Sequence, residues 1–337
     1  MINQIQRSFN IKNKNQFEIL KYIFENKKAL RTEISKDLGL SGPTISRSLS
    51  SYIDKKVLRI TGKKKSKTGR RSDIIEFSDF YKILGIQIDK NFIKFGIFGL
   101  NQTVFDFVKY EIDTSNFEVL INFFRDQMIK ISDMEIVATI IGFPGYIFDE
   151  EVISSSITNW KCEYSDGIVN LISSYFPNSI IKFENDANLL AIREKFLEKG
   201  RKNIICVYWG HGIGMGLVIN GELYVGEGMA GELGQVTFYR NILEDHLRNL
   251  KHKDLVEEWI YILDSLKFIF HPQKIVLNSP FNDIFEEVVE VYKKKYSECS
   301  GINDVEIEIS TNEERAIVEG AVILGTELFL KRITKFA

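Results

Sequence analysis

Residues 204–216 read Ile204-Ile205-Cys206-Val207-Tyr208-Trp209-Gly210-His211-Gly212-Ile213-Gly214-Met215-Gly216, an apolar run followed by glycines at alternate positions. The run over 204–208 predicts a buried strand. Glycines spaced in this way let backbone amides approach a phosphate because no side chain intervenes, although a tight hairpin needs the same glycines. Strands are predicted to follow, over 217–220 and 222–225. The stretch therefore does not match the dinucleotide-binding fingerprint, in which a helix opens at this point.

The elements around this stretch repeat an order that occurs earlier in the chain. Each half is predicted to contain three strands, then a helix, then a further strand. The ranges are 83–89, 92–100, 103–110, 117–131 and 136–141 in the first half, and 204–208, 217–220, 222–225, 257–270 and 274–277 in the second. Two such halves predict a duplicated α/β fold with a cleft between two lobes.

The amino-terminal residues carry helical periodicity instead. Apolar side chains between 17 and 24 recur at the spacing of an amphipathic helix, and a second, short helix is predicted over 32–38. It ends at Gly39, where a left-handed cap costs little, and Ser41 can cap a third helix with Pro43 in its first turn. This order is typical of a helix-turn-helix, whose second helix normally enters the major groove. The face predicted to be exposed shows Thr44, Arg47, Ser48 and Ser51.

A basic wing is predicted to follow the third helix. Strands over 57–60 and 74–77 flank a connector over 61–73. Residues 1–75 hold 18 Lys+Arg and 6 Asp+Glu, a formal charge of +12, so the rest of the chain carries −14. A basic module on an acidic body predicts a polyanion partner for the first part alone. The residues expected to contact DNA are Ser41, Pro43, Thr44, Arg47, Lys63, Lys64, Lys65, Lys67, Arg70 and Arg71. A winged helix that makes only protein contacts is the alternative.

Two polar segments stand out in the body. Phe183-Glu184-Asn185-Asp186-Ala187-Asn188 lies between a predicted strand, 180–183, and a helix, 189–197. A carboxylate beside an amide at a strand end can accept two hydroxyl protons from a polyol, or act as a general base toward one. Alternatively, Asn185 or Asp186 only caps the following helix. The second segment, 226–235, places Glu232 between glycines.

The composition predicts a soluble globular protein of two to three domains, with 44% hydrophobic and 27% charged residues. No run of 18 apolar residues occurs, and the first residues lack the apolar stretch of a signal peptide, so we expect a cytoplasmic protein without membrane contact. The three cysteines lie far apart, which predicts neither a disulfide framework nor a cysteine zinc site.

Together these motifs resemble the ROK family of repressors, open reading frames and sugar kinases. Its glycine-rich signature is matched from Val207 to Val236, and Gly142-Phe143-Pro144-Gly145 and Asn185-Asp186-Ala187-Asn188 match two further motifs. Residues 39–47 and Gly69-Arg70-Arg71 resemble the winged-helix repressor branch, which includes xylose- and N-acetylglucosamine-responsive repressors. The resemblance implies a winged helix over 1–78 and an actin-like, ribonuclease H-like ATPase-type (sugar kinase) body over 79–337. Its lobes would span 79–185, with the C-terminal helix, and 186–320.

The chain departs from the family's kinases at the phosphate loops. Where these have an aspartate followed by glycines, this chain has Gln87, with Asp89 and Lys90 at the glycine positions. Side chains there, one of them a carboxylate, would crowd and repel an ATP phosphate. We therefore expect phosphoryl transfer to be lost, with Gly210, Gly212 and Gly214 as the remnant of the second loop.

The family's structural zinc site is also expected to be absent. Gln235 replaces the usual histidine, and no cysteine lies between Gln235 and Glu258. His246 and His252 have no thiolates or third ligand near them in the sequence, so we expect no metal and no cofactor.

Sugar recognition is expected to remain. By its match to the family motifs, the sugar-binding set is Asn159, Asn185, Asp186, Glu232, Gln235 and Glu244. Asp186, the family's catalytic base, would then bind sugar and not catalyse.

The sequence thus predicts a sugar-responsive DNA-binding regulator, a homodimeric repressor of carbohydrate uptake or catabolism genes, with operator DNA and a sugar or sugar derivative as partners. The alternatives are a ROK-family sugar kinase, similar to glucokinase or N-acetylglucosamine kinase, and a regulator that responds to a protein partner.

Overall fold

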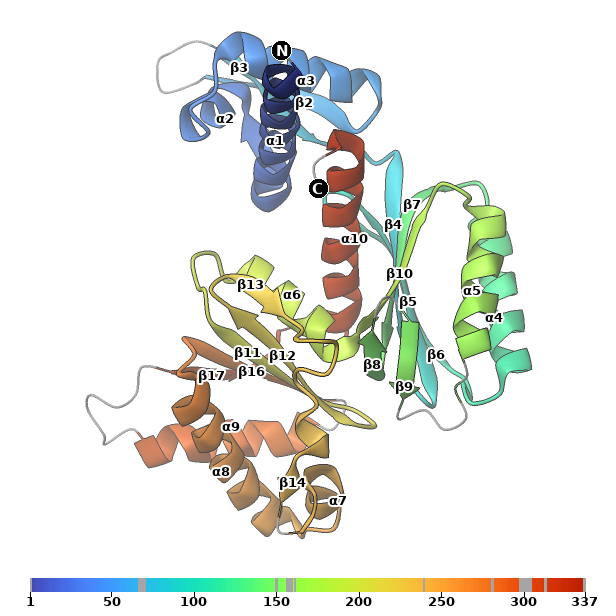
Figure 1. The fold of residues 1–337 in the computed structure, drawn as a ribbon, viewed down its shortest axis with the longest axis vertical. Coiled ribbons are helices and arrows are strands. Elements are labelled where there is room, and N and C mark those ends of the chain that lie inside the picture. The colour runs from blue at the N-terminus through green and yellow to red at the C-terminus, as the bar shows by residue number, and fades with distance from the viewer. Residues whose placement is uncertain are drawn as a thin grey trace.

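The computed structural model describes residues 2–65, 71–148, 151–155, 160, 162–238, 240–279, 282–296, 305–311 and 314–335. Along the chain, a small helical domain is followed by two lobes, each built on a five-stranded sheet (Figure 1). No helix among the described residues combines the length and apolar character needed to cross a membrane.

The amino-terminal domain has the arrangement of a winged helix-turn-helix. Its elements are α1 (Ile2–Asn26), β1 (Lys28–Leu30), α2 (Arg31–Asp37), α3 (Gly42–Asp54), β2 (Leu58–Lys65) and β3 (Arg71–Phe77), and its sheet has the order β1-β3-β2. As predicted, Gly39 takes a left-handed φ of +64° between α2 and α3. Ser41 caps α3, because its hydroxyl oxygen accepts the N–H of Thr44. Pro43 lies in the first turn of α3.

Several details of this domain differ from the prediction. Helix α1 begins at Ile2, well before the apolar stripe. The wing strands run past their apolar residues, since Lys63, Lys64 and Lys65 pair with Asp73, Ser72 and Arg71 through backbone groups that need no apolar side chain. Ser48, predicted to be exposed, is buried, because it lies one helical turn from both Ile45 and Tyr52 on the packed side of α3. Lys67 and Arg70 lie outside the described residues.

The first lobe has a mixed sheet in the order β10-β7-β4-β5-β6. Strands β4, β5 and β6 are antiparallel neighbours, whereas β7 and β10 run parallel to β4. Helices α4 and α5 lie on one face of this sheet (Figure 1). The elements are β4 (Tyr81–Ile88), β5 (Phe92–Gly99), β6 (Val104–Glu111), α4 (Phe117–Lys130), β7 (Glu135–Phe143), β8 (Gly145–Phe148), β9 (Glu151–Ser155), α5 (Cys162–Tyr175) and β10 (Ile180–Asn185).

The second lobe repeats this plan with the sheet order β13-β12-β11-β16-β17. The predicted order of three strands, a helix and a further strand is confirmed in both lobes; the structure adds that the three strands are antiparallel and that the further strand is parallel to the first. The elements are α6 (Asp186–Leu197), β11 (Ile204–Trp209), β12 (Ile213–Ile219), β13 (Glu222–Tyr224), the 3-10 helix η1 (Leu233–Gln235), β14 (Thr237–Phe238), β15 (Asn241–Ile242), α7 (Leu243–Arg248), α8 (His252–Phe270), β16 (Lys274–Asn278), α9 (Asn282–Tyr296) and β17 (Glu306–Ile309).

The glycine-rich stretch differs from its predicted loop. Strand β12 begins at Ile213, so Gly214 and Gly216 lie in a strand and only residues 210–212 form the turn. A Cβ on Gly216 would stand 2.2 Å from the carbonyl oxygen of Ala187 in α6. This glycine is therefore required by the packing of a helix on the sheet, a reason that local spacing cannot show.

Helix α10 (Ala316–Thr334) lies beside the first sheet and crosses α6. At the crossing, a Cβ on Gly320 would stand 2.0 Å from the carbonyl oxygen of Leu189. The two helices thus meet backbone to backbone between the lobes (Figure 1).

The winged helix is packed against the body. The side-chain amide of Asn13 donates to the carbonyl oxygen of Lys335 at 3.0 Å, beyond the end of α10. The Phe24 ring lies 4.9 Å from the ring of Phe196 near the end of α6, and Lys199 Nζ donates to the carbonyl oxygen of Glu25 at 2.7 Å. The carboxyl end of α1 therefore rests on the carboxyl end of α6.

Candidate ligand and DNA sites

A cavity of about 290 Å³ lies between the two lobes, where β10 ends and α6 begins. Five of the six residues predicted to bind sugar line it: Asn185, Asp186, Glu232, Gln235 and Glu244. The sixth, Asn159, lies outside the described residues. Sequence reasoning missed Tyr146 and Met229, which also line the cavity and which no motif singles out.

Asn185 both caps α6 and lines the cavity, so the two readings of its motif are compatible. Its Oδ1 accepts the N–H groups of Ala187 at 2.9 Å and Asn188 at 3.2 Å. Its Nδ2 donates to the carbonyl oxygen of Gly145 at 2.7 Å. Because a side-chain amide has two donor hydrogens, one remains for a ligand.

Asp186 is the first residue of α6 and is 4% exposed. Burial raises the pKa of this carboxyl well above its ordinary value of 3.8, and the charge of nearby Asp89 raises it further. The N–H of Ala187, which donates to Oδ1 at 2.8 Å, opposes that shift. The Asp186 carboxyl can therefore accept a hydrogen bond from a ligand hydroxyl when it is ionised, and donate one when it is protonated.

The raised pKa of Asp186 predicts a pH-dependent cost to stability. The favourable contribution of a group with a raised folded pKa is fully present below the unfolded value, here 3.8, and is lost as the pH rises through the folded value. Asp186→Asn removes this loss, so we expect the variant to gain thermal stability over the parent as the pH rises. Melting temperatures across a pH series measure the gain, with Asp133→Asn, at an exposed position, as the control. A difference that stays constant with pH would contradict the prediction.

Two further carboxylates face the cavity from the second lobe. Burial raises the pKa of Glu232, and the charge of Glu244 adds to that effect. Glu244 is paired with Arg248, whose Nη2 lies 2.9 Å from Oε1. Arg248, which sequence reasoning missed, also donates to the carbonyl oxygen of His211 and so ties α7 to the turn between β11 and β12. Gln235, in η1, is exposed at the cavity.

The residues at the phosphate-loop positions join the two lobes. Gln87 and Asp89, on and just after β4, are each 1% exposed. Gln87 Nε2 donates to the Tyr208 hydroxyl on β11 at 3.0 Å, and an Asp89 carboxylate oxygen contacts His211 Nδ1. The backbone N–H of Lys90 donates to Asp89 Oδ1 at 2.6 Å. Gly210 and Gly212 close the facing turn with a 3.0 Å backbone hydrogen bond, and Gly212 and Gly214 line the interlobe cavity.

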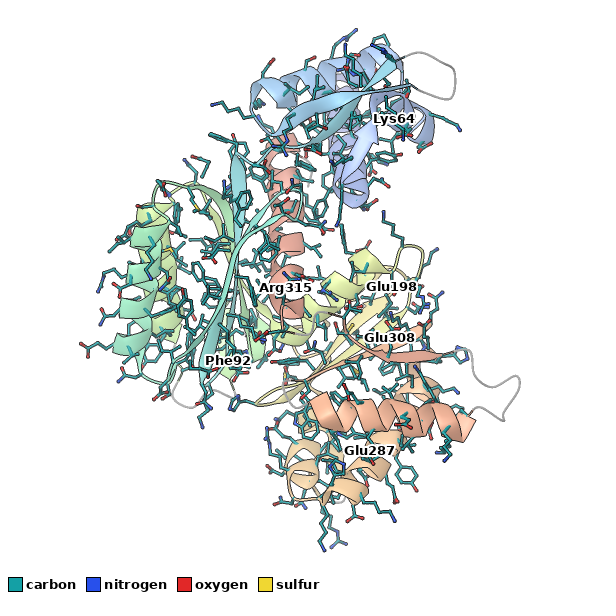
Figure 2. The ribbon with its side chains drawn as sticks, turned by 180° about the vertical axis from the view of Figure 1, so that it is seen from behind. Lys64, Phe92, Glu198, Glu287, Glu308 and Arg315 are labelled. Atoms are coloured by element: carbon teal, nitrogen blue, oxygen red, sulfur yellow. The ribbon has the colours of Figure 1, made fainter. Side chains whose placement is uncertain are left out.

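The predicted DNA-contacting residues lie on α3 and the wing. Ser41, Pro43 and Arg47 are exposed and Thr44 is partly buried at the start of α3. Lys63, Lys64 and Arg71 are exposed on the paired wing strands, and Lys64 lies at the end of the domain away from the body (Figure 2). Apart from Pro43, each exposed position among them carries a small polar group or a cation.

The residues near the family's zinc position do not fit a thiolate site. Cys206 is buried in β11, and within the described ranges no three His, Cys, Asp or Glu side chains are grouped to hold a metal ion. His252 Nε2 lies 2.7 Å from Glu287, and His246 Nε2 lies 3.9 Å from Glu258.

Comparisons with known proteins show which sequences and folds this chain resembles. The ROK family model matches residues 83–244. The xylose repressor of Staphylococcus xylosus is 22% identical over 93% of this chain and 94% of its own length. The xylose repressor of Bacillus subtilis is 28% identical over 67% of this chain and 61% of its own length. A crystal structure of a ROK family transcriptional regulator, described as a homologue of the E. coli MLC protein, has a TM-score of 0.72 at 15% identity, covering 97% of this chain and all of that one.

The family model spans both halves of the cleft, the similarity to a xylose repressor extends over nearly the whole chain, and the winged helix precedes a two-lobed body. The chain therefore resembles the ROK family over residues 83–244, and over nearly its whole length it is similar to a xylose repressor and to a ROK family transcriptional regulator.

Proposed function

We propose that this protein is a sugar-responsive repressor that binds operator DNA through α3 and the wing, and that a sugar in the interlobe cavity lowers its affinity for DNA. The observation that carries the proposal is the position of α6. Its first residues line the cavity, and its last turn contacts the DNA-binding domain.

The cavity chemistry supports a small, uncharged, hydroxyl-rich ligand. Three carboxylates and the Gln235 amide offer oxygens that accept hydroxyl hydrogen bonds, and the Asn185 amide, whose oxygen already accepts two backbone N–H groups, offers a donor hydrogen. The cavity of about 290 Å³ has the dimensions of a monosaccharide site and not of a large ligand. Because the relatives that match over most of the chain are named xylose repressors, xylose is the first ligand to test.

Helix α6 supplies a direct mechanical connection between the cavity and the winged helix. It has 12 residues and is therefore about 18 Å long. A ligand that draws the lobes together displaces Asn185 and Asp186, and a rigid helix carries that displacement to Phe196 and Lys199. The winged helix then changes its position relative to the body and to the DNA. Linkage requires DNA to weaken sugar binding by the same factor.

We also propose that the chain does not use ATP. Phosphoryl transfer requires phosphates held close to backbone amides. In this chain the side chains of Gln87 and Asp89 fill that position and bind Tyr208 and His211 across the cleft. The retained Asp186 favours a sugar kinase as the second candidate, and a coupled ATP-consumption assay with common pentoses and hexoses tests it. Turnover in that assay would overturn the repressor proposal as stated.

A homodimer fits the proposed DNA binding, because two-fold symmetry matches palindromic half-sites. Tyr261, Phe268 and Ile269 are 61%, 70% and 71% exposed on α8, at the i, i+7, i+8 spacing of a single stripe. An apolar stripe of this kind suits an isologous contact with a second copy. Sedimentation velocity of the full chain measures the oligomeric state.

The test of the proposed function is fluorescence anisotropy of the full chain on DNA from its own upstream region, over a salt series and with a panel of sugars. We expect tight, salt-sensitive binding that one sugar releases. Tight binding that no sugar changes would favour regulation by a protein partner. The absence of specific DNA binding at low salt would overturn the proposal that the protein is a DNA-binding regulator.

Arg47→Ala is expected to weaken operator binding about tenfold, because an exposed guanidinium on the recognition helix contributes a base or phosphate contact. Anisotropy at fixed salt measures the change. Arg125→Ala is the control, since Arg125 is an exposed arginine on α4, in the first lobe. Equal affinities for the two variants would show that α3 does not face DNA.

A further inference from the structure

A second cavity, of about 280 Å³, lies where the winged helix meets the body. It is distinct from the interlobe cavity in which the sugar is proposed to bind, called the sugar-side cavity below. One wall is the face of α10 formed by Arg315, Glu319, Val322 and Ile323. Arg315 and Ile323 are eight residue steps apart, so the wall is about 12 Å long. The remaining lining comes from the winged helix (Lys27), the first lobe (Phe98, Gln102, Val104), α6 (Arg193, Leu197) and Thr311. The proposed function assigns no role to this second cavity.

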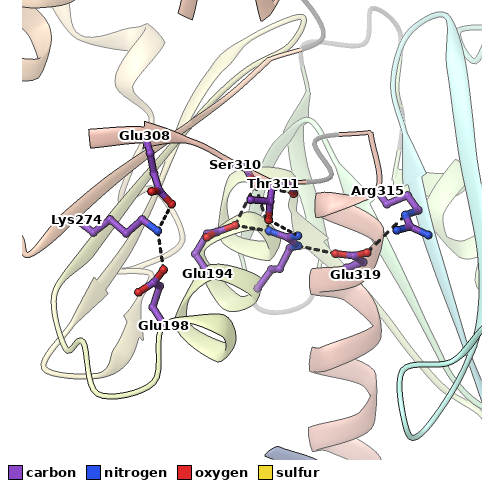
Figure 3. A network of polar contacts seen from close by, with 9 residues as sticks. Glu194, Glu198, Lys274, Glu308, Ser310, Thr311, Arg315 and Glu319 are labelled. Atoms are coloured by element: carbon purple, nitrogen blue, oxygen red, sulfur yellow. Dashed lines mark hydrogen bonds and ion pairs between the residues drawn. The ribbon is translucent and has the colours of Figure 1, made fainter. Parts of the chain in front are cut away.

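The charged groups of the cavity are predominantly cationic. Lys27, Arg193 and Arg315 face it, against Glu319 in the wall and Glu194 behind Arg193. Arg193 Nε lies 2.7 Å from Glu319, and Arg315 Nε lies 3.6 Å from the same carboxylate. Two guanidinium groups therefore share the Glu319 carboxylate. Figure 3 shows Glu319 with dashed lines to Arg315 on one side and to a second guanidinium group on the other. Lys27 is exposed.

One hydrogen-bond donor of a lining residue also lacks an acceptor. Gln102 Nε2 is buried and has no hydrogen-bond partner among the described residues. A buried donor without an acceptor costs free energy that a ligand oxygen can recover. The Thr311 hydroxyl, 3.3 Å from Arg193 Nη2, adds another polar group to this wall. A net positive charge together with an unsatisfied donor matches a ligand that carries oxyanion oxygens.

We propose that this cavity binds a small organic anion with a phosphate or carboxylate head group, and that the anion links the winged helix to the body. The guanidinium of Arg315 and the ammonium of Lys27 attract the head group, and Phe98, Val104 and Val322 contact its carbon skeleton. Arg315 lies at the amino-terminal end of α10, between the lobes (Figure 2), whereas Lys27 follows directly after α1. An occupant thus stabilises the packing of α1 against α6 and α10 and gives the regulator a second input.

Isothermal titration calorimetry of the full chain, without DNA or sugar, tests this proposal. The probes are glycerol 3-phosphate, glycerate and glycerol, which share a skeleton and differ in the head group. We expect saturable binding of one or both anions and none of glycerol. Lys27→Gln and Arg315→Gln are each expected to weaken that binding about fivefold or more, because each removes one charge near the head group.

Three control variants separate this site from the other two. Lys130→Gln removes a cation on α4, Arg47→Ala one on the DNA-facing helix, and Asp186→Asn a carboxylate in the sugar-side cavity. All three are expected to bind the anion as the parent chain does. Absence of saturable binding by both anions, or binding that Lys27→Gln and Arg315→Gln leave unchanged, would overturn the proposal. Since no DNA or sugar is present, either result leaves the proposed function untouched.

Discussion

Phe196→Ala is expected to leave both sugar binding and operator binding intact and to abolish the release of operator by sugar. The Phe196 ring packs against the ring of Phe24 of α1 at 4.9 Å, an apolar contact between α6 and the winged helix. Without the ring, a displacement of α6 no longer moves α1. Allosteric couplings are typically about 5- to 150-fold, and we expect the ratio of operator affinities with and without sugar to fall below about twofold.

Two measurements establish this uncoupling. Calorimetry reports the sugar affinity of the variant, and anisotropy reports its operator affinity with and without sugar. Ile129→Ala is the control, because it truncates an apolar side chain that is 55% exposed on α4, in the first lobe and outside both cavities. Release by sugar that is equally strong in both variants would show that the signal does not pass through the end of α6.

Gly320→Ala is expected to lower the free energy of unfolding by about 2–3 kcal/mol, although alanine is normally the better helix residue. The added Cβ would stand 2.0 Å from the carbonyl oxygen of Leu189 and 2.6 Å from its carbonyl carbon. Backbone atoms cannot rotate away as a flexible side chain can, so α6 and α10 must separate. The change also shifts α6, so sugar affinity is expected to fall as well.

Thermal and urea unfolding measure this loss. Gly42→Ala is the control, because it also replaces a helical glycine, and no atom lies within 4 Å of the Cβ it would add. We expect Gly42→Ala to change stability by less than about 0.5–1 kcal/mol. Equal stability of the two variants would contradict the close backbone contact between α6 and α10 at Gly320.

Local chemistry was sufficient to predict the winged helix and the order of elements in both lobes. Gly39 and Ser41 act through their own turns, where a left-handed φ and a side-chain cap depend only on nearby backbone. The alternation of strand and helix likewise follows from periodicity. Five of the six residues predicted to bind sugar line one cavity, and that prediction came from the resemblance to a family, since spacing alone left Asn185 as either a cap or a ligand.

Tertiary structure alone decided the contacts between residues far apart in the chain. Gln87 meets Tyr208, Asp89 meets His211, and Phe24 meets Phe196, because the topology brings the lobes and the winged helix together. The role of Gly216 belongs to the same class. Its spacing resembles that of a phosphate loop, yet its packing partner is the backbone of Ala187 in α6. A sequence pattern specifies which conformation each segment adopts, whereas the partner of a side chain depends on how the packed elements exclude one another.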